Sequence, residues 1–68
     1  MEVDGTKLQR LREDRVLSQR ELASLAGLTQ QTVWRFENGS TNAHPRTIRK
    51  IAEVLGVEPK ELVKKERL

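Results

Sequence analysis

Two helix-start signals separated by a glycine constrain this chain more than any other feature. Ser18 followed by Glu21 is a capping box, in which the serine hydroxyl accepts a bond from a backbone amide and the carboxylate reaches back to the cap. Gly27 suits the left-handed backbone that ends many helices, and Thr29 is a good cap for a second helix. The sequence therefore predicts two short helices that meet at a tight turn containing glycine.

Helical patterns also surround this pair. Asp4 is a suitable N-cap for a first helix, and Pro45 suits the first position of a later one. In that later helix, Ile48, Ile51 and Leu55 recur at helical spacing, whereas no segment alternates like a β-strand. We expect an all-α fold, a compact five-helix bundle formed by a single domain over residues 1–68. The expected helices span 5–14, 19–26, 30–38, 45–55 and a last segment that begins at Pro59.

The composition excludes several kinds of site. The 68 residues include no cysteine and one histidine, His44, so neither a disulfide nor a thiolate metal site can form, and a lone histidine makes no zinc site. The acidic residues fall at expected caps and helix faces, so no set of nucleophile, base and orienting group can be assembled. We expect no enzyme, no catalytic or metal-binding residue and no cofactor. With no apolar run of about 18 residues and no signal peptide, we expect a cytoplasmic protein without a membrane partner.

The charge balance favours an anionic partner. The net charge is +3 and the pI is about 9.8, which suits a domain that binds a polyanion. The excess is small, so position matters more than the sum, and Arg46, Arg49 and Lys50 form one basic cluster. The alternative for each cluster is a solvated, salt-bridged helix face, which we favour for the basic residues after position 59.

The segment 18–39 resembles the helix-turn-helix of the lambdoid phage repressor and Cro family, also called xenobiotic-response-element-type regulators. The matching residues are Gln19, Leu22, Ala23, Ala26, Gly27, Leu28, Thr29, Gln30, Gln31, Val33, Arg35, Phe36 and Glu37-Asn38-Gly39. The likeness extends back to residues 8–12 and forward through 48–57, so it covers nearly the whole chain. It implies a sequence-specific transcriptional regulator that binds double-stranded DNA, and it favours a repressor located at the nucleoid.

The resemblance places the start of the second helix of the motif in the major groove. Gln30 and Gln31 then face base edges, and a glutamine can pair with adenine through both N6 and N7. The phage repressors carry a Gln-Gln pair at the same place. Arg35 lies one turn after Gln31 and suits guanine or a phosphate, while Thr32 is a further candidate for a base contact.

A second group of residues is expected on the DNA backbone, where contacts fix register rather than sequence. In the family, the glutamine that matches Gln19 clamps a phosphate and braces the recognition helix. The expected phosphate contacts are Gln19, Thr29, Asn38, Ser40, Asn42 and Arg46. The family's loop after the recognition helix is often rich in lysine, whereas here it is polar and uncharged, which predicts a weaker clamp.

The resemblance also implies two structural contacts. Arg12 and Glu37 would form a partly buried ion pair between the first helix and the recognition helix. The family dimerises through its fifth helix and the loop before it, represented here by Val57, Pro59 and Leu62. Because paired recognition helices read a pseudo-palindrome, we expect a weak homodimer, or one that forms on a pseudo-palindromic operator.

Trp34 can be interpreted in two ways, and two other functions are possible for the motif. Trp34 departs from the family pattern, and we expect it to pack over the loop or the helix after Pro45, with contact to the DNA backbone or a partner as the alternative. A close functional variant is an antitoxin or controller protein that regulates its own operon. A different class is a helix-turn-helix that binds protein and lacks sequence-specific DNA binding; Gln30, Gln31 and Arg35 disfavour it.

Overall fold

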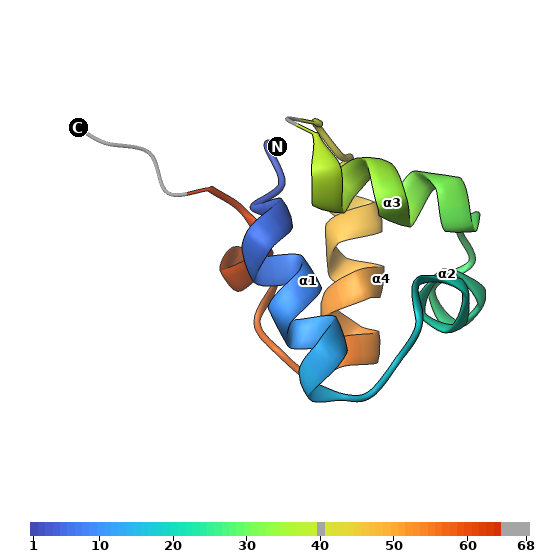
Figure 1. The fold of residues 1–68 in the computed structure, drawn as a ribbon. Coiled ribbons are helices and arrows are strands. Elements are labelled where there is room, and N and C mark those ends of the chain that lie inside the picture. The colour runs from blue at the N-terminus through green and yellow to red at the C-terminus, as the bar shows by residue number, and fades with distance from the viewer. Residues whose placement is uncertain (40, 65–68) are drawn as a thin grey trace.

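The computed structural model describes residues 1–39 and 41–64. The helices are α1 (Gly5–Asp14), α2 (Gln19–Ala26), α3 (Gln30–Asn38) and α4 (Pro45–Leu55), followed by the short 3₁₀ turn η1 (Pro59–Leu62). Figure 1 shows α4 in the middle of the molecule, between α1 and α2, with α3 lying across its N-terminal end. α2 packs against both α3 and α4, so the two helices of the predicted motif form a corner on the central helix.

The local start and stop signals act as predicted. Ser18 Oγ accepts from the Glu21 amide at 3.0 Å, and Glu21 Oε1 accepts from the Ser18 amide at 2.8 Å, which completes the capping box. Gly27 ends α2 with φ +71°, a left-handed conformation that favours glycine. Thr29 caps α3 by accepting from the Thr32 amide. The helix-turn-helix corner is therefore built largely by its own sequence.

The prediction of a fifth helix was wrong. Pro59 begins a single 3₁₀ turn of four residues, and the fold has four α-helices within the described residues. Val63 after it is extended and pairs with Val3 in an isolated antiparallel bridge. Lys64 also donates its amide to the Glu2 carbonyl at 3.0 Å. This pairing requires an extended chain just where a longer helix would need to continue.

The segment before α1 is extended and held on both sides. The Val3 amide donates to the Thr41 carbonyl at 3.0 Å, and the Asp4 amide donates to the Leu62 carbonyl at 2.8 Å. The Val3 side chain is buried. The first residues thus join the loop before α4 to the turn η1, a connection that no local sequence pattern predicted.

The core lies between the four helices and η1. Its largest fully buried side chains are Leu8, Leu22, Ile48, Ile51, Leu55, Leu62, Val3 and Val33. Leu25 of α2 does not join this core and is 63% exposed. Leu25 follows Leu22 by three residues but lies past the edge of the buried stripe, which Ala23 and Ala26 complete. None of the helices in the described ranges is long and apolar enough to cross a membrane.

Candidate nucleic-acid interface

The outer face of α3 carries the expected base-reading side chains. Gln30, Gln31 and Arg35 are exposed, and Thr32 is half-buried. The opposite face buries Val33, Phe36 and Glu37. Because residues three and four apart share one side of a helix, the packing of this inner face directs the polar side chains of the outer face into solvent.

A hydroxyl pair marks the beginning of α3. Thr29 Oγ1 accepts from the Thr32 amide at 3.2 Å and lies 2.8 Å from Thr32 Oγ1. Each hydroxyl can both donate and accept, so one hydrogen serves the pair and the second can bond an outside acceptor. Such a donor beside the positive end of a helix suits an anion.

A buried ionic network holds α3 in place. Arg12 of α1 contacts Glu37 of α3 through two bonds, Nε to Oε2 at 2.6 Å and Nη2 to Oε1 at 3.1 Å. Gln19 of α2 donates its side-chain amide to the same Oε1 at 3.0 Å. The Glu37 side chain is only 1% exposed. One carboxylate of α3 thereby anchors the ends of two other helices.

Arg12 also connects this network to the chain turn between α1 and α2. Its Nη1 donates to the Leu17 carbonyl at 2.7 Å. The hydrogen bond with Glu37 raises the pKa of Arg12 above its ordinary value and outweighs the desolvation that lowers it, so the guanidinium stays charged. Val16, the residue before Leu17 in this turn, has φ +54°, which is a strained backbone conformation for a β-branched residue.

The expected phosphate contacts differ in how freely their side chains can move. Gln19 donates one hydrogen of its side-chain amide to Glu37, which leaves the second amide hydrogen available. Asn38 donates from Nδ2 to the Trp34 carbonyl at 3.0 Å, so its side chain lies back along α3. Asn42 and Arg46 are exposed. Ser40 lies outside the described residues.

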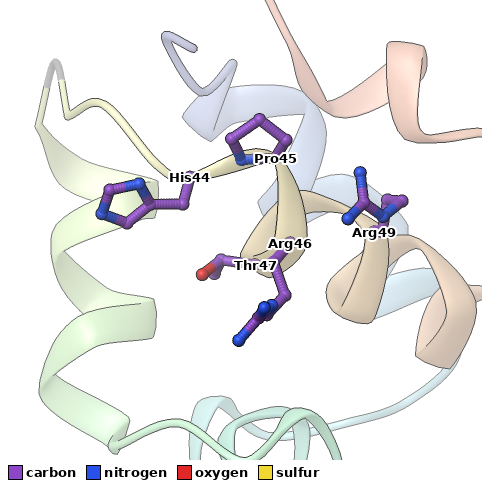
Figure 2. A pocket seen from close by; sticks show the side chains of 5 residues that line it. All are labelled: His44, Pro45, Arg46, Thr47 and Arg49. Carbon is purple, nitrogen blue, oxygen red and sulfur yellow. The ribbon is translucent and has the colours of Figure 1, made fainter.

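Arg46 lies at the start of α4, beside an open hollow. This hollow is lined by His44, Pro45, Arg46, Thr47 and Arg49. Figure 2 shows His44 and Thr47 directed toward α3, while Arg49 extends from the other side of the helix. His44 precedes α4 but makes no side-chain cap bond, and Pro45 has no amide hydrogen. The hollow thus brings together Arg46 and Arg49, two members of the basic cluster that the sequence indicated.

The residues expected in a dimer interface do not share one environment. Val57 and Pro59 are partly exposed, whereas Leu62 is only 1% exposed. Leu62 belongs to the core of this chain, where the turn η1 packs against α4 and α1. Its side chain is therefore withdrawn from the surface that Val57 and Pro59 present.

Sequence reasoning also missed a close approach at Gly5. A Cβ atom at this position would lie 2.5 Å from the Phe36 carbonyl oxygen and 2.6 Å from that of Glu37. The backbone of α1 thus touches the last turn of α3, and only glycine fits there. A glycine in the first turn of a helix, where it lowers helix propensity, was the one available signal.

Comparisons with known proteins support the helix-turn-helix fold. A family model described as a helix-turn-helix domain matches residues 5–64. The HTH-type transcriptional repressor RghR of Bacillus subtilis is 40% identical over 58 residues, which are 84% of this chain and 43% of that protein. The chain spans less than half the length of the first curated relatives that it matches.

Two solved structures show how the same fold is used in different chains. The restriction-modification controller protein C.AhdI from Aeromonas hydrophila is 40% identical with a TM-score of 0.79, covering 84% of this chain and 86% of that one. The hydroxypropylphosphonic acid epoxidase from S. wedmorenis is 33% identical with a TM-score of 0.80, covering 88% of this chain but 32% of the enzyme. The enzyme therefore shares only a part with this chain. By the extent of the family match and of these likenesses, the chain belongs to the helix-turn-helix family of transcriptional regulators, of the Cro and phage-repressor type.

Proposed function

We propose that this chain binds double-stranded DNA in a sequence-specific manner and regulates transcription, with α3 in the major groove. The observation that carries the proposal is the outer face of α3, where Gln30, Gln31 and Arg35 are exposed together. Their helix is fixed by the network around Glu37, so the side chains are presented from a rigid support. Preorganisation of this kind lowers the entropy cost of binding.

The base-reading roles follow from hydrogen-bonding capacity. Gln30 and Gln31 each offer a donor and an acceptor and can pair with adenine through N6 and N7. Arg35, one turn later on the same face, can donate two bonds to guanine O6 and N7. Thr32 has its hydroxyl engaged with Thr29, so its methyl group is the part that suits a base, through contact with a thymine.

The phosphate-binding roles fall on both sides of α3. Gln19 and Thr29 lie at the starts of α2 and α3, where a positive helix end and a remaining hydrogen-bond donor favour an anion. Arg46 lies at the start of α4, whose first-turn amides lack a side-chain cap. Asn38 and Asn42, with Ser40 between them, extend this line of contacts along the loop.

We further propose that two copies bind a pseudo-palindromic operator, since one small domain reads about half a site. Val57 and Pro59 are the candidates for the contact between copies. Repression is favoured by the likeness to RghR, a transcriptional repressor. Control of its own operon is the variant that the likeness to C.AhdI, a controller protein, supports.

A protein-binding role is the second candidate. Trp34 is 55% exposed, although a tryptophan usually buries most of its surface. The likeness to one part of an epoxidase also shows this fold within a longer chain of another activity. Binding to a protein partner through α3 would not require the hydrogen-bonding set of Gln30, Gln31 and Arg35, so we favour DNA.

The decisive experiment is a selection from random duplex DNA, followed by titration of the selected sequence and a scrambled one at two salt concentrations. We expect a palindromic motif bound at least ~10³-fold more tightly than the scramble. Gln30→Ala should weaken binding to the motif by about 1–3 kcal/mol and leave the scramble unaffected. Arg46→Ala should weaken both and reduce the salt dependence. Enrichment of no motif, with binding that disappears in salt, would contradict the proposal.

A further inference from the structure

Trp34 is an aromatic side chain that the fold leaves largely exposed, as it does Val16 and Leu25. It is 55% exposed, whereas Phe36, the other aromatic residue of the chain, is 6% exposed. Trp34 also lies outside the set of partly buried side chains that pack on the core. Our expectation that it would cover the loop or α4 was therefore wrong. More than half of the surface of this large, mostly apolar residue is thus left in water.

The place of Trp34 on α3 connects it to the base-reading residues. Positions four apart form a row along a helix, and Gln30, Trp34 and Asn38 make one such row. Gln31 and Arg35 make the adjacent row. Asn38 Nδ2 donates to the Trp34 backbone carbonyl at 3.0 Å, so the Asn38 side chain lies back over the turn that carries Trp34. Trp34 thus lies inside the polar outer face of α3, one turn after the first glutamine.

The surroundings of Trp34 discriminate between possible contacts. A protein-binding hot spot is usually an aromatic side chain within a packed, desolvated patch. Trp34 instead has glutamine, arginine and asparagine as its neighbours on α3, and these side chains match the polar edges of bases. In the major groove, the apolar feature beside those edges is the 5-methyl group of thymine.

We propose that Trp34 is a specificity-determining residue that packs its indole ring against the 5-methyl group of a thymine in the operator. This inference rests on the proposed DNA-binding function. The thymine lies next to the base pairs that Gln30 and Gln31 read, because Trp34 follows them by one turn on the same face. Discrimination here depends on shape and apolar contact, and it adds a base pair to the site without another hydrogen bond.

Replacing single thymines of the selected operator with deoxyuridine tests this directly. The exchange removes one methyl group and keeps every hydrogen-bonding atom. For the wild-type chain we expect one thymine per half-site at which the exchange weakens binding about fourfold, the effect of losing one buried methyl group. In Trp34→Ala the same exchange should have no effect at that position, and selection should lose its preference there.

Leu25→Ala is the matched control, because Leu25 is also exposed but lies on α2. It should keep the wild-type sensitivity to deoxyuridine at every thymine. Thermal unfolding of Trp34→Ala should match wild type, which separates a lost contact from a lost fold. If a motif is selected but no thymine near the glutamine-read pairs is sensitive, or if Trp34→Ala stays sensitive, the inference is wrong and the DNA-binding function stands. If no motif is selected, the proposed function itself fails.

Intrinsic fluorescence gives a second, independent measurement. The chain has one tryptophan and no tyrosine, so its emission reports on position 34. Acrylamide, a neutral quencher, should quench the free protein readily. At saturation with the selected operator the quenching should fall at least threefold, because the indole is then covered. Unchanged access of acrylamide to Trp34 in the saturated complex would overturn the inference even where binding is tight.

Discussion

The two faces of α3 are opposites in how their polar groups are satisfied. On the inner face, Glu37 bonds to Arg12 and Gln19, and the described residues include no buried side-chain polar atom without a partner. On the outer face, Gln30 and Gln31 project into solvent. The inner face therefore fixes where the helix lies, and the outer face is available to a second molecule.

Stability and recognition are therefore separable on one short helix. A change on the inner face leaves a buried charge or a steric conflict inside the protein, and it should be measured first in the free energy of unfolding. A change on the outer face leaves only solvated groups, and surface substitutions of that kind usually alter stability by less than about 0.5 kcal/mol. Substitutions on each face test this division.

Glu37→Ala should have the largest effect on stability. It leaves the guanidinium of Arg12, which is 10% exposed, without its close carboxylate partner, since the carboxylate of Glu13 lies 4.0 Å away. Removing one partner of a buried ion pair costs about 3–5 kcal/mol. We expect the loss at the lower end of this range, because Arg12 keeps its bond to the Leu17 carbonyl. Urea denaturation followed by circular dichroism measures it.

Glu53→Ala is the control for this change, because Glu53 is an exposed glutamate on α4. Its midpoint in urea should lie close to that of wild type. Glu37→Gln keeps an oxygen acceptor and should fall between the two alanine variants. Equal midpoints for Glu37→Ala and Glu53→Ala would show that the network adds nothing to stability, and the division between faces would fail.

Gly5→Ala tests the inner face through shape alone. In a helix with free space around the glycine, this exchange usually stabilises the fold by about 0.5–1 kcal/mol. Here the new Cβ would meet two backbone oxygens of α3 closer than 3.0 Å, so α1 must shift. We expect a net loss of about 1–3 kcal/mol, the usual cost of overpacking. Thr6→Ala, at the exposed neighbouring position, should show no such loss in the same thermal melt; a stabilised Gly5→Ala would refute the close approach.

Gln31→Ala tests the outer face. Binding to the selected operator should weaken by about 1–3 kcal/mol, the value of one bidentate base contact. The unfolding midpoint should stay at the wild-type value, because Gln31 is exposed. Gln9→Ala on α1 is the matched glutamine control and should change neither quantity. If Gln31→Ala lowered stability as much as affinity, the outer face would not be independent of the fold.

Val16→Asn tests the turn that the inner network secures. Val16 is 85% exposed and has φ +54°, a conformation that costs a β-branched residue about 1–2 kcal/mol and that asparagine tolerates better. We expect the exchange to stabilise the fold by about 0.5–1 kcal/mol and to leave DNA affinity unchanged. Arg15→Asn, one residue earlier with φ −96°, should give no gain. A loss of stability in Val16→Asn would mean that the turn is not strained.

Local signals predicted most of this fold, and two of the failures, at the fifth helix and at Gly5, involve distant contacts. The capping box at Ser18 and the glycine at Gly27 each act within a few residues, so the sequence located α2 and its end correctly. The fifth helix failed because Val63 pairs with Val3, which lies at the other end of the chain. The role of Gly5 was missed for the same reason, since the atoms that exclude a side chain there belong to α3.

The candidate site shows a similar limit. Helical spacing indicates which residues of α3 share a face, and it placed Gln31 and Arg35 together. Spacing does not tell whether a neighbouring element covers a given position, so the exposure of Trp34 had to come from the packed structure. The assignments to bases and phosphates stay predictions, because they depend on how a second molecule lies against α3.

The smallest effect concerns Glu21, an exposed carboxylate that contrasts with buried Glu37. Its hydrogen bonds with the backbone and hydroxyl of Ser18 lower the pKa of Glu21 below its ordinary value of 4.5. A lowered pKa in the folded state means a contribution that is present above pH 4.5 and is lost as the pH falls through the lowered value. Glu21→Gln keeps a side chain suited to a capping box but does not titrate. The difference in melting temperature between wild type and Glu21→Gln should therefore be constant near neutral pH and shrink in acid. A difference that does not change between pH 7 and pH 3 would show that the charge of Glu21 adds nothing to the cap.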